Sequence, residues 1–234
     1  MTTGFAALRD QVLAANRSLA DRGLAPFTFG NASGIDRDAN AVVIKPSGVK
    51  YAELTQDDLV VVDLDGRVLE GSRRPSSDTP THLALYKAFE RIGGVAHAHS
   101  HFATAWAQSC QEIPCFGTTH ADHFHGAIPI VDFLRETEVV GEYEANTGHA
   151  IQRRFSRLDP MTMPAVLVAG HGAFSWGLNV LEAVETMAVL EEVARLAFDT
   201  VVLNAAAAPL PEHVRDKHFS RKHGPDAYYG QPRQ

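Results

Sequence analysis

Residues 93–100 read GGVAHAHS, and this stretch decides the predicted fold. The glycine pair ends a helical pattern, and the apolar residues after it predict a buried strand over Val95–His99. Side chains two positions apart in a strand point to the same face, so His97 and His99 face the same way. Both imidazoles can then converge on one ion, although a pair of hydrogen-bonded surface histidines has the same spacing. The stretch therefore predicts a core strand that carries a candidate site.

Helical and β-type patterns alternate on both sides of this strand. Apolar spacing and helix-end signals predict helices at Phe5–Asp21, Asp78–Arg91, Ser100–Ser109, Glu138–Leu158, Leu181–Ala206 and Glu212–Lys222. Further strands are expected at Phe27–Phe29, Ala41–Ile44, Leu59–Leu64, Arg67–Leu69, Ala127–Val131, Ala165–Ala169 and Ala173–Trp176, and residues 117–126 are expected to form a polar, histidine-rich loop. Helices interspersed with mostly antiparallel strands indicate an α/β fold, a three-layer α/β/α sandwich around a mostly antiparallel central sheet.

The composition is that of a globular protein. The 234 residues are 45% hydrophobic and 21% charged, and no linker-like segment divides them, so we expect a single domain over residues 1–234. A net charge of −7 without a continuous basic stripe argues against nucleic-acid binding. No run approaches roughly 18 apolar residues and no signal-peptide pattern is present, so we expect no membrane association and a cytoplasmic location. Cys110 and Cys115 are expected to be reduced thiols.

A further histidine extends the strand pair into a possible metal site. His171 follows a predicted strand between two glycines, which let the backbone approach a ligand closely. Three histidines at the ends of two core strands match the pattern of a catalytic zinc site that keeps open positions for substrate. Asp78 is a candidate fourth ligand, or a group hydrogen-bonded to a metal-bound water, and it is equally well placed to cap the helix that follows.

A second group of residues is polar but mostly uncharged. Its members lie in three short segments: Gly30, Asn31 and Ser33, then Lys45, Ser47 and Gly48, then Ser76 and Ser77. Backbone amides, hydroxyls, one lysine and a helix N-terminus are the parts of an anion-binding site, for which phosphate is the natural ligand. Each segment taken alone also fits an ordinary turn, so only their joint presence argues for a site.

A third group lies in the histidine-rich segment and the C-terminal tail. Asp122 is a candidate general base beside neighbouring histidines, or else a residue of an ordinary loop turn. Tyr228 and Tyr229 offer a phenol for acid–base chemistry, or else anchor the tail. The sequence has no dinucleotide-binding glycine motif, no P-loop and no nucleophile elbow, which argues against hydride transfer through a bound dinucleotide.

Six motifs together resemble the L-ribulose-5-phosphate 4-epimerases of the class II aldolase and adducin superfamily, and the match runs from the first helix to the tail. They are Gly30–Ser33, Lys45–Gly48, Pro75–Asp78, His97–Ser100, Gly117–Asp122 and Tyr228–Gln231. The resemblance implies a class II aldolase-like fold and the interconversion of L-ribulose 5-phosphate and D-xylulose 5-phosphate, as in arabinose or ascorbate breakdown. It also implies retro-aldol cleavage of the C3–C4 bond, rotation of the aldehyde and re-addition, with zinc as the Lewis acid.

The resemblance assigns roles to residues of all three groups. One Zn²⁺ per subunit, or Mn²⁺ or Co²⁺, would be bound by His97, His99 and His171, with Asp78 close to it. The phosphorylated ketopentose would be held by Gly30, Asn31, Lys45, Ser47, Gly48, Ser76 and Ser77. The acid–base pair would be Asp122 and Tyr229, supported by His218. The family forms homotetramers, so residues 224–234 of one subunit would complete a neighbouring active site.

Some residues depart from the family pattern, and two other functions stay open. His123 and His125 stand where aromatic residues are expected, and we favour surface substitutions over an effect on the pH profile near Asp122. A helix that begins at Ser100 would turn His101 away from the metal. A phosphate-sugar aldolase of the same superfamily would release the aldehyde, but aldolases of the fuculose phosphate type carry glutamate where this chain has Asp78. An adducin-like binding protein would use the fold without catalysis, which the intact zinc ligands argue against.

Overall fold

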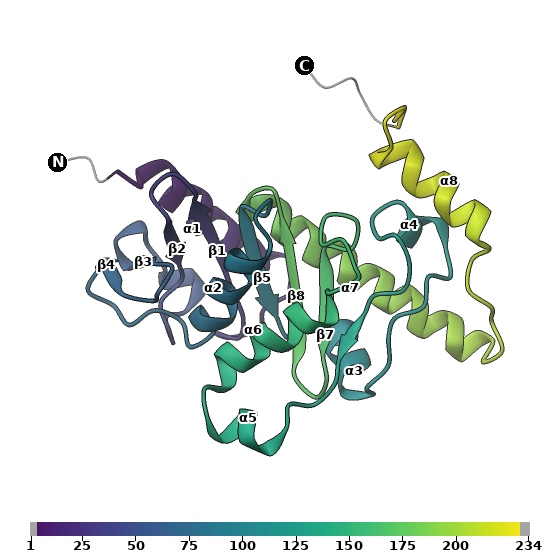
Figure 1. Ribbon diagram of the computed structural model, residues 1–234, viewed down its shortest axis with the longest axis horizontal. Helices are drawn as coiled ribbons and strands as arrows, with labels where there is room; N and C mark the ends of the chain where they lie inside the picture. Colours follow the sequence, from purple (N-terminus) through teal and green to yellow (C-terminus); the bar gives the residue numbers. More distant parts are fainter. Residues whose placement is uncertain (1–3, 230–234) are drawn as a thin grey trace.

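The computed structural model describes residues 4–229, which form a sheet with helices on both sides (Figure 1). The strands are β1 (Asn31–Asp36), β2 (Ala41–Ile44), β3 (Val60–Asp63), β4 (Val68–Glu70), β5 (Gly94–Ala98), β6 (Ile130–Val131), β7 (Ala165–Val168) and β8 (Gly172–Gly177). The helices are α1 (Ala6–Asp21), α2 (Thr79–Ala88), α3 (His101–Gln108), α4 (Thr118–Ala121), α5 (Glu136–Val140), α6 (Tyr143–Arg154), α7 (Val180–Leu203) and α8 (Glu212–His223). Two short 3-10 helices, Tyr51–Glu53 and Gln56–Asp58, follow β2.

The strand that carries the histidine pair lies inside the sheet. The strand order is β4-β3-β2-β1-β5-β8-β7-β6, and β6 and β7 are parallel whereas every other neighbouring pair is antiparallel. Within this register His97 lies opposite Asn31 of β1 and Phe174 of β8. The prediction of a mostly antiparallel central sheet is confirmed.

Helices cover both faces of the sheet and complete the three predicted layers. α1 and α7 pack on each other and on the sheet, with α3 against α7, whereas α2 and α6 pack on each other over the opposite face (Figure 1). Beneath α2 and α6, Trp176 is fully buried and lies 5.2 Å from the Phe89 ring and 5.1 Å from the Phe155 ring. Full burial of a large apolar side chain contributes about 1.5–3 kcal/mol, so such clusters hold the helical layers in place.

Several predicted elements were wrong in their placement. Phe27–Phe29 is not a strand but a turn with Phe27 at a φ of 58°, and the strand begins at Asn31. The predicted helix over Glu138–Leu158 is two helices, because α5 ends at Val140 and α6 begins at Tyr143. The predicted polar loop at residues 117–126 contains the short helix α4, and α2 ends at Ala88, before the predicted Arg91.

Asn16 fixes α1 to the sheet through its buried side-chain amide. Its Nδ2 donates to the Ala32 carbonyl at 2.9 Å, and its Oδ1 accepts from the Ala32 backbone N–H at 2.9 Å. The Asn16→Ala substitution leaves two buried backbone groups unpaired, so we expect the free energy of unfolding to fall by about 2–4 kcal/mol in urea denaturation. The exposed Gln108→Ala control on α3 should change it by less than about 0.5 kcal/mol. Equal urea midpoints for Asn16→Ala and the native chain would rule out this role.

Candidate metal centre and active site

Three histidines converge where β5 ends and β8 begins. His97 lies in β5, His99 directly follows it, and His171 directly precedes β8. Because β5 and β8 are antiparallel neighbours, the end of one strand meets the start of the other. One ligand nitrogen from each ring lies within 4.8 Å of the other two, and the ring centroids are 4.8–4.9 Å apart. The structure thus brings together the three histidines that the sequence assigned to a metal.

The orientation of His97 is fixed by the strand beside it. Its Nδ1 donates to the Ala173 carbonyl at 2.9 Å, which turns Nε2 toward His99 Nε2. The ring also stacks on Phe174 with a centroid separation of 4.2 Å and an interplanar angle of 17°. Gly172 makes the close approach possible, because a Cβ there would lie 2.9 Å from the Ala98 carbonyl oxygen.

The donor set fits a divalent cation. Burial and the neighbouring His97 lower the pKa of His99 to about 4, and burial with both other histidines lowers the pKa of His171 to about 4, so both rings are neutral at pH 7. His97 Nε2 and His99 Nε2 face each other at 3.1 Å, and within residues 4–229 the buried His171 Nδ1 has no hydrogen-bond partner. Three imidazoles whose ligand nitrogens face one point are a ligand set for Zn²⁺.

Asp78 lies beside this cluster and is held by the polar segments. It occupies the N-cap position of α2 without a side-chain capping bond. Its Oδ2 instead accepts from Asn31 Nδ2 at 2.6 Å and lies 3.4 Å from Ser76 Oγ. Burial alone would raise the pKa of Asp78, but the nearby His97 and the Asn31 amide are among the groups that lower it overall. The carboxylate is therefore ionised and adds negative charge near the histidines, outside the set of ligand atoms within 4.8 Å.

The predicted anion-binding segments also meet at this point. The loops that carry Ser47 and Ser76 pair through their backbones, with Ser47 N–H donating to the Arg74 carbonyl and Ser76 N–H to the Lys45 carbonyl. Asn31 is buried and donates to Ser76 Oγ at 3.0 Å. Within residues 4–229, its buried Oδ1 has no partner. A half-open cleft of about 830 Å³ lies beside these loops and is lined in part by Ser47, Ser76 and Ser77.

Lys45 supplies the positive charge of this group. Its side chain is 2% exposed, with Nζ 4.9 Å from the centroid of the Tyr51 ring and 3.3 Å from the Pro46 carbonyl oxygen. Burial lowers the pKa of Lys45 to about 8. Gly30, at a φ of 83°, allows the chain to pass against β5, because a Cβ there would lie 2.4 Å from the His97 carbonyl oxygen. The backbone of the predicted anion-binding segments thus lies directly against β5, the strand that carries His97.

The predicted acid–base residues gather in a second place, between α4 and α8. Asp122 Oδ1 accepts from His218 Nδ1 at 3.1 Å and from Arg221 Nε at 3.0 Å, and Oδ2 accepts from Arg221 Nη2 at 2.7 Å. Burial alone would raise the pKa of Asp122, but these hydrogen bonds hold it below its usual value. The half-exposed Tyr229 ring lies over the Arg221 guanidinium at 4.7 Å. We call Asp122, His218, Arg221 and Tyr229 the acid–base cluster.

The acid–base cluster is separate from the three histidines. β5 and β8 lie in the middle of the molecule, whereas α4 and α8 pack on each other at one end of it (Figure 1). No hydrogen bond or ion pair connects the two groups within residues 4–229. α8 has no buried residue of its own. Within one copy of the chain, the predicted metal ligands and the predicted acid–base residues therefore form two separate groups.

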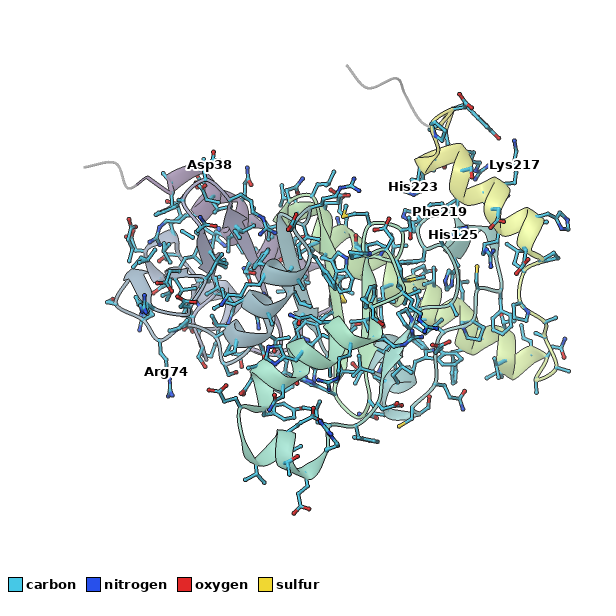
Figure 2. The ribbon with its side chains drawn as sticks, in the orientation of Figure 1. Asp38, Arg74, His125, Lys217, Phe219 and His223 are labelled. Carbon is cyan, nitrogen blue, oxygen red and sulfur yellow. The ribbon has the colours of Figure 1, made fainter. Side chains whose placement is uncertain are left out.

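The histidines that depart from the family pattern help to attach α8. His125 Nε2 is 2.9 Å from Asp216 Oδ1, and its ring lies 4.8 Å from Phe219, which in turn stacks on His223 at 4.6 Å. Figure 2 shows these three aromatic side chains together where α4 meets α8. His123 contacts Lys222 Nζ at 3.1 Å. His101 is exposed at the first position of α3 and lies against Phe102, outside the three-histidine group, as the helix start at Ser100 predicted.

Two neighbours of the predicted residues were not found from the sequence. Arg221 binds both oxygens of Asp122, and its position three residues after His218 on one helix was a signal that it shares that face. The Tyr51 hydroxyl donates to the Gly30 carbonyl at 2.8 Å, and its ring lies beside Lys45. No local pattern pointed to Tyr51, because its contacts come only from the folding of distant segments.

Comparison with known families identifies the class of protein. Residues 10–198 match the Class II Aldolase and Adducin N-terminal domain. The chain therefore belongs to the class II aldolase and adducin family, which confirms the resemblance found in its motifs. Among solved structures it is similar to an L-fuculose 1-phosphate aldolase, with a TM-score of 0.79 and 25% identity over 92% of this chain and 96% of that one.

Comparison with curated proteins gives closer relatives. The sequence is 52% identical over 224 residues to L-ribulose-5-phosphate 4-epimerase UlaF of Salmonella paratyphi B, covering 96% of this chain and 98% of the relative. The UlaF protein of Salmonella typhi shows the same identity and coverage. The solved L-fuculose-1-phosphate aldolase of Thermus thermophilus is 26% identical, with a TM-score of 0.68 over 88% of this chain and 100% of that one.

Proposed function

We propose that the chain is a metal-dependent isomerase, an L-ribulose-5-phosphate 4-epimerase that interconverts L-ribulose 5-phosphate and D-xylulose 5-phosphate. One observation carries this proposal: the three-histidine cluster and the Asp122–Tyr229 pair occur together in one chain. That chain is 52% identical to UlaF. The anion-binding loops beside the histidines support a sugar-phosphate substrate. The intact set of three candidate metal ligands argues against a purely structural, adducin-like role.

The substrate's chemistry requires two proton-transfer groups. The hydrogen on C4 is β to the ketone and is not acidic, so inversion proceeds through cleavage of the C3–C4 bond. The C4 hydroxyl loses its proton, the bond electrons form an enediolate on C1–C3, and glycolaldehyde phosphate is released within the site. The aldehyde rotates and C3 attacks its other face, where the new C4 oxygen takes up a proton. A base and an acid on opposite sides of the aldehyde serve the two faces.

Asp122 and Tyr229 are the groups to carry these protons. The Asp122 carboxylate accepts the hydroxyl proton of one epimer, and the Tyr229 phenol gives a proton to the other. His218 donates to Asp122 Oδ1 and fixes the carboxylate's orientation. The lowered pKa of Asp122 keeps it ionised at neutral pH, as a base requires.

The metal would be held by His97, His99 and His171, with the Asp78 carboxylate close to them. Zn²⁺ is the proposed ion, and Mn²⁺ or Co²⁺ suits the same ligands. Bound there, it would supply a Lewis acid that stabilises the negative charge of the enediolate. Asn31 and Ser76 hold Asp78 in place, so they would link the metal centre to the anion-binding loops.

The phosphate would be bound by Lys45 together with Gly30, Asn31, Ser47, Gly48, Ser76 and Ser77. Because the pKa of Lys45 is about 8, its charge is present below that pH and lost above it. We expect the KM for L-ribulose 5-phosphate to rise as the pH passes from 7 to 9, measured by initial rates. In Lys45→Met the KM should already be high at pH 7 and nearly independent of pH over this range. A native KM that stays constant would mean that Lys45 does not bind the phosphate.

A complete site would combine two copies of the chain. The separation of the acid–base cluster from the histidines supports an assembly in which one subunit's C-terminal part completes its neighbour's site. We propose that this assembly is a homotetramer of single-domain subunits, as the resemblance implies. Of the predicted tail, residues 224–229 lie against α8, whereas residues 230–234 lie outside the described residues.

The cellular location stays a prediction. Among residues 4–229, none of the helices combines the length and apolar character that spanning a bilayer demands. We propose a cytoplasmic location because sugar phosphates are charged metabolites that are retained inside cells.

Proton NMR of the zinc-loaded protein with L-ribulose 5-phosphate tests the function. D-xylulose 5-phosphate that forms without free glycolaldehyde phosphate supports the epimerase. Accumulating aldehyde would indicate a phosphate-sugar aldolase, the activity named for the similar solved structures. No turnover by a zinc-loaded sample would contradict the proposal.

A further inference from the structure

Arg221 contacts both members of the acid–base pair. Its Nε and Nη2 donate to the two Asp122 oxygens at 3.0 and 2.7 Å, and its guanidinium carbon lies 4.7 Å from the centroid of the Tyr229 ring. Its backbone carbonyl also accepts from Tyr229 N–H at 3.0 Å, so the same residue holds the start of the tail. Within residues 4–229, no other side chain both donates hydrogen bonds to the Asp122 carboxylate and lies against the Tyr229 ring.

We propose that Arg221 is the positioning residue of the acid–base pair and the counter-ion that its two members share. This inference rests on the proposed epimerase function. At rest, the guanidinium balances the Asp122 carboxylate through a two-pronged hydrogen bond. Arg221 does not touch the reacting atoms; it fixes where Asp122 and Tyr229 can sit relative to each other.

The proton transfers of one turnover explain why one cation beside both Asp122 and Tyr229 favours the reaction. The proton of the C4 hydroxyl passes to Asp122, and the phenol proton of Tyr229 passes to the new C4 oxygen. The negative charge therefore moves from the carboxylate to the phenolate, while the substrate's total charge is unchanged. Because Arg221 lies against both groups, it balances the charge in either state without moving. Return of the proton from Asp122 to Tyr229 through water restores the starting state.

Other titratable groups surround Asp122, but none of those described takes the place of Arg221 between the Asp122 carboxylate and the Tyr229 ring. From α8, His218 binds only Oδ1, and His223 donates to the Asp122 backbone carbonyl at 2.8 Å. Lys222 Nζ contacts His123, which flanks Asp122 in the chain, and lies 5.9 Å from the Tyr229 ring. Of the causes that hold the pKa of Asp122 below its usual value, the Arg221 hydrogen bond is the largest.

The test replaces Arg221 by alanine and by lysine and measures kcat and KM across pH. In Arg221→Ala we expect kcat to fall about 10²-fold with little change in KM, because the acid–base pair is displaced while substrate binding is intact. The pKa of Asp122 should rise, so the acidic limb of the kcat profile should move to higher pH. Added guanidinium ion should restore part of the kcat, and an equal concentration of ammonium should not. The kcat of Arg221→Lys should lie between those of the native enzyme and Arg221→Ala, because lysine keeps the positive charge but lacks the paired N–H donors of the guanidinium.

Arg215 provides the matched control on the same helix. Its side chain and that of Arg221 are both 24% exposed, and Arg215 pairs with Asp216 rather than Asp122. Arg215→Ala should keep the native kcat and pH profile. If Arg221→Ala lowers kcat and the melting temperature but leaves the acidic limb unchanged and is not rescued by guanidinium, Arg221 only attaches α8 and the inference is wrong.

A carbon-13 NMR titration of the Asp122 carboxyl separates this inference from the proposed function, because it needs no substrate. A higher pKa of Asp122 in Arg221→Ala than in the native chain supports the ion pair, and an equal pKa overturns it. Failure of the proposed function would instead appear in the native enzyme, as absence of turnover.

Discussion

His99→Ala is expected to remove both the bound metal and the activity. His99 supplies one of three imidazoles that face a common point, and its Nε2 lies 3.1 Å from that of His97. With two histidines left, the site loses a ligand that its geometry requires. Because Lewis-acid stabilisation is worth several kcal/mol, we expect kcat/KM to fall by about 10³-fold or more. Metal content by elemental analysis and rates on L-ribulose 5-phosphate measure the two effects.

His101→Ala is the matched control for this experiment. His101 is two residues away, but it is exposed on α3 and packs against Phe102. Its variant should keep most of the metal and activity. Metal loss in His101→Ala, together with metal retention in His99→Ala, would show that the ligand set has been assigned to the wrong histidines.

Asp122→Asn is expected to leave the metal bound while it abolishes proton transfer. The amide has nearly the carboxylate's shape, but it cannot accept a proton. General acid–base catalysis contributes about 10²–10⁴-fold, so we expect kcat to fall by about this factor with the metal content unchanged. Elemental analysis and kcat measured on the same preparation separate this result from that of His99→Ala.

Asp216→Asn controls for the loss of a carboxylate near α4 and α8. Asp216 is half-exposed and accepts from His125 at 2.9 Å and from Arg215, neither of which is a member of the acid–base cluster. The control should retain nearly native kcat. If Asp216→Asn loses as much activity as Asp122→Asn, attachment of α8 rather than proton transfer limits the rate.

The three-histidine cluster was predictable from the sequence because the pattern that forms it is local. Alternation in a strand places His97 and His99 on one face, and the glycines beside His171 indicate close packing at a strand end. Antiparallel pairing of β5 and β8 then brings the three rings together. The mostly antiparallel sheet followed from short β-type segments interspersed with helices.

The strand β1 was missed because its burial depends on distant partners. Residues 30–33 have the composition of a turn, yet β1 lies inside the sheet. Its polar groups form hydrogen bonds with residues distant in the sequence. The Ala32 backbone bonds to the Asn16 side chain, and Ser33 Oγ bonds to His82 at 2.7 Å and to Tyr86 at 2.9 Å. No local pattern reveals these bonds, so the segment was interpreted as a loop.

The break between α5 and α6 was missed for a similar reason. The Glu138 carboxylate accepts from Arg135 N–H and from the Arg153 side chain, so it caps α5 and bridges to α6. Gly141 ends α5 in a conformation outside the helical region. The apolar pattern continues across the break, which hides it from periodicity. The pair of hydrogen bonds between Arg221 and Asp122 was missed for the same reason, because it joins residues 99 positions apart in the sequence.

Complementation between two inactive variants tests the central claim most directly, namely that one copy's histidines work with another copy's acid–base cluster. His99→Ala and Asp122→Asn are co-expressed, and the mixed assemblies are assayed for D-xylulose 5-phosphate. If sites form between copies, about a quarter of them combine native histidines with a native Asp122, so about a quarter of the native activity should return. If each site is built within one chain, every site carries a defect, and an inactive mixture would contradict the account.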